Sequence, residues 1–236
     1  MIDNDTRELL LAAARNNAEW CDAVCRGHGP RGEFTPDAWT SAHPTPPLYP
    51  DAVTLTPDAS AAALLAGIDA GSPGGRSVKD SFAVLDLAGD GFEVLFEAQW
   101  IHHPAPKAAP SGLEWSEVST AGELAEWEAA WDGEESTGLF HPALPGSDIV
   151  FLAGRAGGRI VAGAAANRTG PVVGVSNLFA HDDADVDAAW AGVLSGIAAR
   201  WPGLPIVGYE HGDDLDAALR NGFTAIGPLR VWLHTA

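Results

Sequence analysis

The chain has 236 residues, of which 46% are hydrophobic and 19% charged, and it contains nine tryptophans. This composition excludes a disordered chain and predicts either one large globular domain or two small ones. The 32 acidic and 13 basic residues give a formal net charge of −19. We therefore expect neither nucleic acid nor a membrane as a partner, because anionic phosphates would repel this surface.

The amino-terminal stretch MIDNDTRELLLAAARNNAEW has no basic region followed by an apolar one. No run of about 18 apolar residues occurs elsewhere, so we expect a cytoplasmic protein. The two cysteines, Cys21 and Cys25, are four residues apart. This spacing fits neither a disulfide framework nor a C-x-x-C site, so reduced thiols are expected.

The first half of the chain predicts a helix-plus-hairpin α+β domain over residues 1–105. Apolar residues recur with helical spacing from 3 to about 27, and the proline-rich stretch 34–55 predicts an ordered loop. A second helix is expected to start at Asp58, and two apolar runs around AGDG in 81–101 predict a hairpin. The proline-rich segment HHPAPKAAPSG, 102–112, is the expected linker.

The second half, 113–236, alternates strand and helix patterns more clearly. A strand at 113–119 precedes a helix at 120–131 with a capping-box pair, Thr120 and Glu123. Three consecutive strands joined by GRAGG and RTGP turns are expected within 148–180, as a meander. A helix from about 186 to 201, a strand at 205–210, a helix ended by Gly222 and a last strand at 224–234 follow.

This order of elements resembles the GCN5-related N-acetyltransferase (GNAT) fold. The most specific local match is LDAALRNGFTAIGPLRVWL, in which the last helix ends on a glycine before the last strand. The resemblance implies an α+β fold with a mixed sheet flanked by helices. The first half could be a degenerate copy of the same fold.

The resemblance also implies acetyl-CoA or another acyl-CoA as cofactor. In the family, glycines and a basic residue at a helix start hold the CoA pyrophosphate. Here the corresponding positions are Asp183–Ala188, with neither glycine nor a basic residue, so the motif is degenerate. The residues expected to contact the cofactor are Asn177, Leu178, Phe179, Ala184, Val186 and Ala188.

Four aspartates stand where the pyrophosphate motif would be: Asp182, Asp183, Asp185 and Asp187. One interpretation is that they cap the helix, as aspartate commonly does. Clustered carboxylates beside His181 could also form a metal site, although no metal-binding loop pattern is present and we expect no metal. The third interpretation is a site for a cationic ligand.

Polar residues end the two strands that part in the GNAT fold. On the resemblance, Glu210 is the candidate general base and Tyr209 the candidate general acid, with His211 and Asn177 as further catalytic candidates. The alternative is that Glu210 and His211 form a solvated strand end and that Tyr209 packs in the core.

Two further groups of residues could carry chemistry. Cys21 and His28 lie seven residues apart on one helical face and could form a thiolate nucleophile, although a buried structural cysteine explains Cys21 equally. His102 and His103 could bind a metal, but a surface or linker role is favoured because no nearby acid or thiol completes a tetrahedral site.

The sequence therefore supports one leading function and two alternatives. The leading hypothesis is a GNAT-like acyltransferase that moves an acyl group from a CoA thioester to a small amine. The first alternative is a GNAT-fold protein that has lost CoA binding and binds or converts another small molecule in the cleft. That small molecule could be a cation. The second is a non-catalytic interaction protein. The sequence does not predict the oligomeric state.

Overall fold

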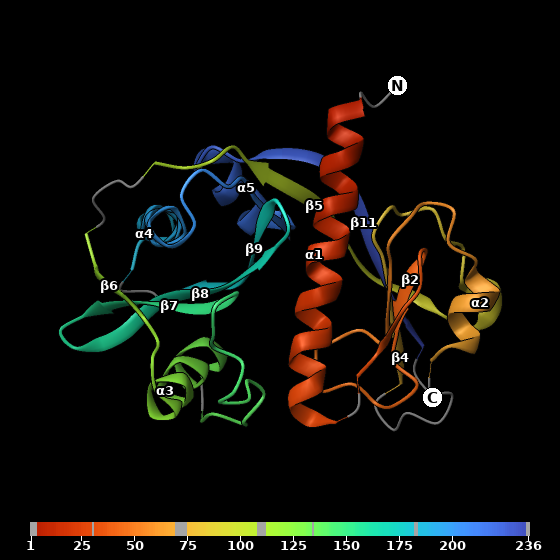
Figure 1. Ribbon diagram of the computed structural model, residues 1–236, viewed down its shortest axis with the longest axis horizontal. Coiled ribbons are helices and arrows are strands. Elements are labelled where there is room, and N and C mark those ends of the chain that lie inside the picture. Colours follow the sequence, from red (N-terminus) through yellow and green to blue (C-terminus); the bar gives the residue numbers. More distant parts are fainter. Residues whose placement is uncertain are drawn as a thin grey trace. The chain divides into compact units, whose positions relative to one another are not determined.

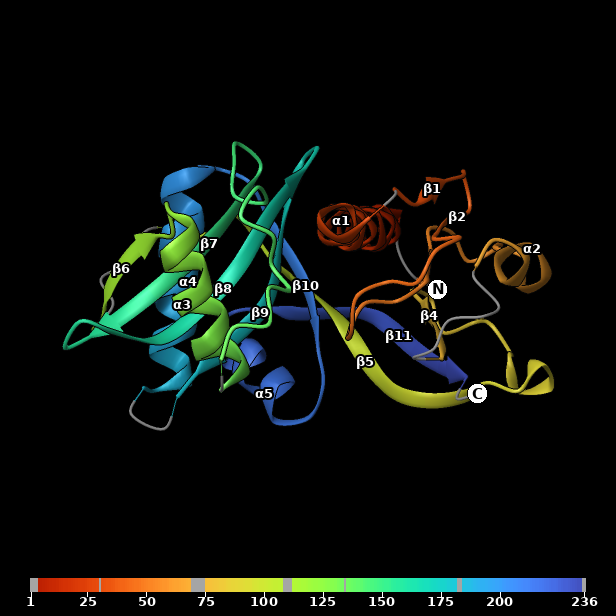
Figure 2. The same ribbon diagram turned by 90° about the horizontal axis from the view of Figure 1, so that it is seen from below.

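The computed structural model describes residues 4–29, 31–68, 75–107, 112–133, 135–181 and 184–234. The chain divides into two compact units, one formed by Met1–Trp100 with Ile226–Ala236 and the other by Ile101–Ala225. Figures 1 and 2 show the elements of both units in two views. None of the helices in the described ranges is long and apolar enough to cross a bilayer.

The second unit carries the elements that the sequence predicts for residues 113–225. They are β6 (Glu114–Glu117), α3 (Ala121–Asp132), β7 (Ile149–Ala156), β8 (Arg159–Thr169), β9 (Val172–Ala180), α4 (Val186–Arg200), β10 (Ile206–Glu210) and α5 (Gly212–Arg220). The sheet order runs β10-β9-β8-β7-β6, and β7, β8 and β9 form the expected antiparallel meander. In Figure 1, α4 covers one face of this sheet and α3 the other.

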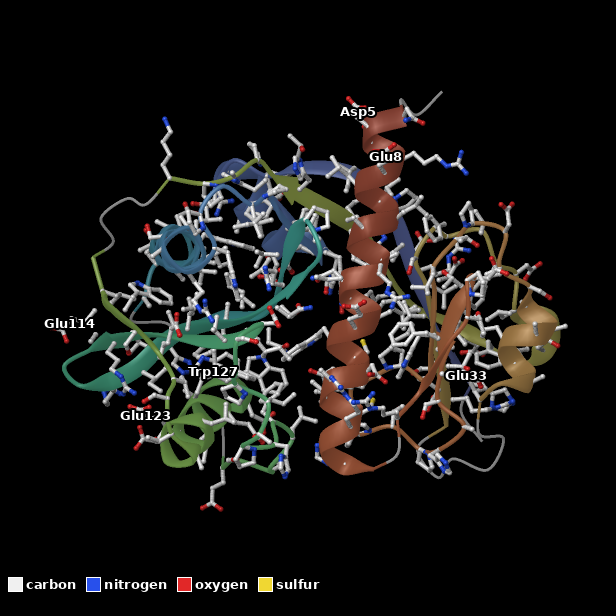
Figure 3. All side chains as sticks on the ribbon, viewed as in Figure 1. Asp5, Glu8, Glu33, Glu114, Glu123 and Trp127 are labelled. Carbon is white, nitrogen blue, oxygen red and sulfur yellow. The ribbon has the colours of Figure 1, made fainter. Side chains whose placement is uncertain are left out.

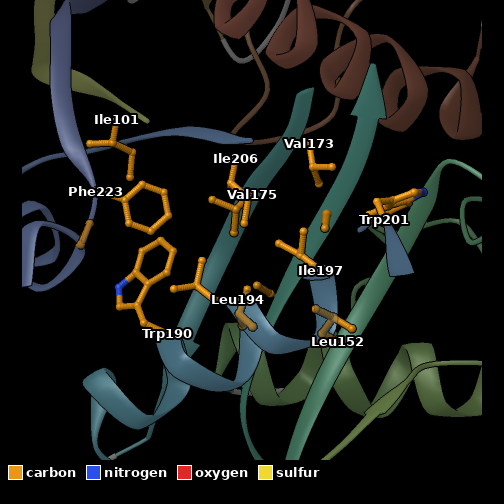
Figure 4. Packing of buried hydrophobic residues seen from close by; sticks show 14 of the residues in the cluster. Ile101, Leu152, Val173, Val175, Trp190, Leu194, Ile197, Trp201, Ile206 and Phe223 are labelled. Carbon is orange, nitrogen blue, oxygen red and sulfur yellow. The ribbon is translucent and has the colours of Figure 1, made fainter. Parts of the chain in front are cut away.

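A large apolar core fills the space between the sheet of the second unit and α4. Trp190, Val193 and Ile197 from α4 pack on strand residues such as Val173 and Ile206 (Figure 4). These α4 residues recur at spacings of three and four, which places them on one face of the helix. Burial of this face against the sheet holds the start of α4 in place.

The predicted capping box at the start of α3 is confirmed. The Thr120 hydroxyl accepts a hydrogen bond from the Glu123 amide (3.2 Å), and the Glu123 carboxylate accepts one from the Thr120 amide (3.1 Å). Farther along α3, the carboxylate of Glu128 is 1% exposed and accepts hydrogen bonds from the amides of Thr137, Leu139 and Phe140. Glu128 thereby ties the loop after α3 to the helix.

The first unit contains one long helix and short strands. Its elements are α1 (Asn4–His28), β1 (Glu33–Phe34), β2 (Ala38–Thr40), β3 (Ala52–Thr54), α2 (Ala61–Ala66), β4 (Arg76–Asp80), the 3-10 helix η1 (Ala88–Asp90), and parts of β5 (Glu93–His103) and β11 (Thr224–His234). The strand order is β1-β2-β3-β4-β11-β5. In Figures 1 and 2, α1 and α2 lie on opposite sides of these strands.

Three predictions for the first half were wrong. The stretch 81–101 is not a hairpin: β4 ends at Asp80, β5 begins at Glu93, and β11 lies between the two strands in the sheet. The second helix begins after Ser60, whose hydroxyl accepts from the Ala63 amide, and not at Asp58. His102 and His103 belong to β5 and not to a linker.

The observed units differ from the predicted domains, 1–105 and 113–236, in the placement of the last strand. Residues Arg230–His234 of β11 pair antiparallel with Arg76–Asp80 of β4, so the carboxyl-terminal strand completes the sheet of the first unit. Conversely, the end of β5, from Ile101 to His103, belongs to the second unit. The division into domains 1–105 and 113–236 therefore stays a prediction.

Candidate functional site

Strands β9 and β10 run side by side for only a short distance. They pair in parallel at Ile206 with Val173 and at Val207 with Gly174, and no later pair follows, although β9 continues to Ala180 and β10 to Glu210. Where the two strands meet, position 208 has little room for a side chain, since a Cβ at Gly208 would lie 2.9 Å from the Val175 side chain. The two strands thus leave unpaired backbone edges beyond residue 174.

A β-bulge distorts β9 at the same point. In the β8–β9 register, Ala165 is opposite Ser176 and Gly163 is opposite Phe179, so Asn177 and Leu178 share the space opposite one residue. Asn177 takes the left-handed conformation with φ of 54°, which asparagine tolerates better than most residues. The structure therefore gives Asn177 a backbone role, whereas the sequence predicts a catalytic or cofactor-binding one.

A cavity of about 460 Å³ lies beside the end of β9, where α4 and α5 begin. Its lining residues are Leu178, Phe179, Ala180, Val186, Asp213, Asp214, Asp216, Ala217 and Arg220. The charged ones all come from α5, at positions 213, 216 and 220, which share one helical face, and 214. Three carboxylates and one guanidinium therefore line the cavity.

The predicted site residues divide into two groups around this cavity. Leu178, Phe179 and Val186 line it, and their contact with a cofactor stays a prediction. Ala184 and Ala188 are half-buried near the start of α4 but are not lining residues, and neither are Asn177, Tyr209, Glu210 and His211. The sequence analysis missed the α5 aspartates and Arg220, for which the acidic run GDDLD was the available signal.

The start of α4 is closed by its own aspartates. The N-cap residue Asp185 accepts a hydrogen bond from the Asp187 amide at 3.0 Å, which confirms the helix-capping interpretation for this residue. The Asp187 carboxylate in turn accepts hydrogen bonds from Arg220 (3.2 Å) and from the Asn221 side-chain amide (2.9 Å). Asp182 and Asp183 lie outside the described residues.

These contacts stabilise the ionised form of the Asp187 carboxyl. Hydrogen bonding to Arg220 and Asn221 lowers the pKa of the Asp187 carboxyl. Arg220, the single cationic lining residue, is thereby already paired with a carboxylate. The helix end and the cavity together present negative charge where the GNAT fold would hold a pyrophosphate.

Glu210 has the most perturbed carboxyl near the cavity. Alternation along β10 places its side chain on the same face as Ile206, which packs in the core beneath α4. Burial raises the pKa of Glu210 to about 8, and the nearby Asp214 carboxylate adds to this rise. Because Asp214 lines the cavity, the Glu210 carboxyl lies close behind the acidic wall and is largely protonated at neutral pH.

Tyr209 and His211 flank Glu210 but have different surroundings. Tyr209 is half-buried on the opposite side of β10 by strand alternation. His211 is exposed and is the N-cap residue of α5, without a side-chain hydrogen bond to the helix. Their roles as general acid and catalytic histidine stay predictions.

The other candidate residues lie outside this cavity, and their catalytic role stays a prediction. Cys21 is 1% exposed, and burial raises the pKa of its thiol, which disfavours a thiolate nucleophile. His28 is exposed at the end of α1. His102 and His103 lie in β5, where His103 packs edge-on against Phe223 at 5.2 Å between ring centres. Within the described ranges, no group of three or more His, Cys, Asp or Glu is placed to hold a metal ion.

The comparisons with known proteins identify the fold. Neither a scan against models of protein families nor a search of curated proteins gives a match. Among solved structures, the chain is similar to a GCN5-related N-acetyltransferase from Kribbella flavida, with a TM-score of 0.65 and 16% identity over 95% of this chain and 96% of that one.

Two further structures agree. A protein from Novosphingobium aromaticivorans assigned to the GNAT family has a TM-score of 0.54 and 13% identity, over 94% of this chain and 99% of that one. A GNAT-like protein from Streptococcus suis has a TM-score of 0.52 and 13% identity, over 97% and 99%. The chain thus has a GNAT-like fold, and the similarity extends over both units and not only over residues 113–236.

The GNAT fold implies acetyl-CoA, but the residues at the start of α4 do not fit its diphosphate. The first turn of α4 does not begin with a glycine. The Asp187 amide already donates a hydrogen bond to Asp185, and the Asp187 carboxylate already forms an ion pair with Arg220. Each carboxylate near a phosphate costs about 1 kcal/mol at exposed distances. The apolar residues Leu178, Phe179 and Val186 remain available to a ligand without a diphosphate.

Proposed function

We propose that this GNAT-fold protein binds a small cationic molecule of the amine class in the cavity between β9, α4 and α5, and that CoA is not its ligand. The observation that carries the proposal is the acidic lining of that cavity: Asp213, Asp214 and Asp216, with Arg220 already paired to Asp187. Ligand pockets combine apolar walls with a few charged groups that select the ligand's charge. Here the selecting groups are carboxylates.

Glu210 gives this site a proton-linked component. With a pKa of about 8 it is mostly neutral at pH 7, and a cation bound beside Asp214 would favour the ionised form. Binding would then release a proton to solvent and strengthen as the pH rises towards 8. Ordinary surface carboxylates would not produce this pH dependence.

Thermal unfolding with 1,4-diaminobutane and with acetyl-CoA tests the proposal directly. The diamine at 100 times its Kd should stabilise the protein by about 2.7 kcal/mol, which corresponds to a rise in Tm of about 5–10 °C for a chain of this size. Millimolar acetyl-CoA should leave Tm unchanged. A shift with acetyl-CoA and none with the diamine would reject the proposal.

A pair of variants separates the cavity from the general charge of the protein. Asp214→Asn should weaken diamine binding about tenfold, because it removes one carboxylate from the cavity wall. Asp132→Asn removes the same charge at an exposed position at the end of α3 and should have no effect. Equal effects of the two variants would mean that the diamine responds only to the net charge.

N-acyl transfer to a small amine is the second candidate function. Two observations support it: β9 and β10 part beyond Gly174 and Val207, and Glu210 has a pKa suited to a general base near neutral pH. In this role Glu210 would accept the proton of the attacking amine. Release of free thiol from an acyl thioester in the presence of the amine, lost in Glu210→Gln, is the result that this candidate requires.

A further inference from the structure

A second cavity, of about 230 Å³, lies in the first unit beside the amino-terminal half of α1. Its lining residues are Arg7, Leu10, Leu11, Pro57, Phe82, Val84 and Pro228. All except Arg7 are apolar, and none of them takes part in the site described above. The cavity is therefore an independent feature of the molecule.

The helical side of this cavity combines apolar side chains with one cation. Arg7, Leu10 and Leu11 are three and four residues apart and share one face of α1. Arg7 is exposed and makes no ion pair or hydrogen bond to another residue of the described ranges. The neighbouring acids Asp5 and Glu8, labelled in Figure 3, are two and one positions away and so do not share its face, and Glu8 accepts a hydrogen bond from Asn4.

A buried carboxylate forms hydrogen bonds with the backbone of the opposite wall. Asp80 is 0% exposed and accepts hydrogen bonds from the amides of Phe82 (3.3 Å) and Leu85 (2.7 Å), so it fixes the turn that presents Phe82 and Val84. Ala83, between these two lining residues, has a φ of 51°. The turn leaves Val84 55% exposed.

Strand β11 allows the helix to approach closely. A Cβ at Gly227 would lie 2.9 Å from a methyl group of Leu10, which shows how closely Leu10 approaches the strand beside Pro228. Leu10 itself is 6% exposed. The cavity is therefore bounded by a packed helix, a fixed turn and a strand, which is the construction expected of a small-molecule pocket.

We propose that this cavity binds a small amphipathic carboxylate, whose apolar chain fills the space between Leu10, Phe82 and Val84 and whose carboxylate pairs with Arg7. A guanidinium that has no partner among the described residues and lies beside an apolar cavity is complementary to such a molecule in both charge and polarity. A chain with a formal charge of −19 attracts few anions without a local cation. Arg7 is therefore the residue that selects the anion.

Isothermal titration of the full chain with octanoate tests this assignment. Octanoate should bind saturably with one site, octylamine should not bind to this site, and butanoate should bind more weakly because it fills less of the cavity. Arg7→Gln should weaken octanoate binding about tenfold, as expected for loss of a charge-assisted hydrogen bond. Arg31→Gln, at an exposed position of the same unit, is the matched control and should bind as the wild type does.

A second variant protects the test against misfolding. Val84→Glu places a carboxylate on the exposed part of the wall, so it should abolish octanoate binding and leave Tm unchanged. Absence of saturable octanoate binding, equal binding of octylamine, or no effect of Arg7→Gln would overturn the proposal. A change in oligomeric state on adding octanoate, measured by light scattering, would also overturn it, because it would assign the apolar surface to self-association.

Discussion

At the scale of single residues, the protonation of Glu210 links the stability of the second unit to pH. In the folded chain its pKa is raised to about 8 from an ordinary value of 4.5. Between these two values the unfolded chain loses the proton and the folded chain keeps it, so rising pH favours unfolding. The stability is therefore fully present below about pH 4.5 and decreases as the pH approaches 8.

Replacement by glutamine should remove this loss of stability. We expect the free energy of unfolding of Glu210→Gln to exceed that of the wild type increasingly from pH 5 to pH 8.5, by on the order of 3 kcal/mol at the upper end. Urea unfolding at a series of pH values measures it. Glu114→Gln, at an exposed position of the same unit, is the control and should follow the wild type. Parallel curves for Glu210→Gln and the wild type would show that Glu210 titrates normally.

At Asn177, we expect the backbone conformation to affect stability more than the side chain does. With φ of 54°, Asn177→Gly should keep or slightly raise the stability, whereas Asn177→Val should lower it by about 1–2 kcal/mol. The urea midpoint of each variant gives the result. If glycine were as damaging as valine, the asparagine side chain and not the bulge would be the important feature.

At the scale of elements, the docking of α4 on β6 depends on a missing side chain. A Cβ at Gly192 would lie 2.0 Å from the indole of Trp115, whereas a Cβ at Gly196 would lie 2.9 Å from the flexible end of Leu152. Gly192→Ala should therefore destabilise the protein by about 1–3 kcal/mol through overpacking, despite the better helix propensity of alanine.

Gly196→Ala is the matched control on the same helix. Leu152 can move its terminal methyl groups, so the gain in helix propensity, about 1 kcal/mol, should offset the crowding. Thermal unfolding of both variants compares them. A Gly192→Ala variant as stable as Gly196→Ala would mean that Trp115 has room to move away from α4.

The elements of the second unit could be predicted because their apolar residues recur with a clear period, as in the α4 residues Trp190, Val193 and Ile197. Strand β4 could not, because its sequence RSVKD contains the charged residues Lys79 and Asp80, both of which are buried. Lys79 donates a hydrogen bond to Asn17, a distant residue on α1, and no local pattern predicts this pairing. The placement of β11 in the first unit could not be predicted from local sequence patterns either. Such patterns indicate which residues form a strand, but not which strands pair with one another.

The candidate site was predicted in part for a similar reason. Leu178, Phe179 and Val186 follow from the position of one strand end and one helix start, which the sequence indicates. The α5 aspartates have the pattern of an ordinary solvated helix, and only the fold turns positions 213, 216 and 220 towards the cavity. Glu210 was identifiable as a polar residue at a strand end, but its raised pKa depends on burial beside Asp214.

At the scale of the whole molecule, strands β5 and β11 each contribute residues to both units. Residues 101–103 at the end of β5 belong to the second unit, although the rest of β5 belongs to the first. Residues 226–234 of β11 belong to the first unit, where Arg230–His234 pair with β4. Each half of the sequence therefore lacks a strand that the other half supplies.

This exchange predicts that neither half of the sequence folds well alone. A fragment of residues 112–236 keeps the periodic elements β6 to α5, but it loses the end of β5 from its sheet and leaves the apolar residues Leu229, Val231 and Trp232 of β11 without β4. These three side chains are at most 6% exposed in the full chain, and an exposed apolar strand without a partner favours aggregation. We expect the fragment to be insoluble or to melt without cooperativity.

Coexpression distinguishes strand exchange from simple fragility of the fragment. Residues 1–107 and 112–236, produced together as separate chains, should form a soluble one-to-one complex, because every strand then finds the partner it has in the intact protein. Size-exclusion chromatography with light scattering and thermal unfolding would measure the complex. Cooperative melting of 112–236 by itself as a monomer would contradict the exchange and support the division within residues 102–112 that the sequence predicts.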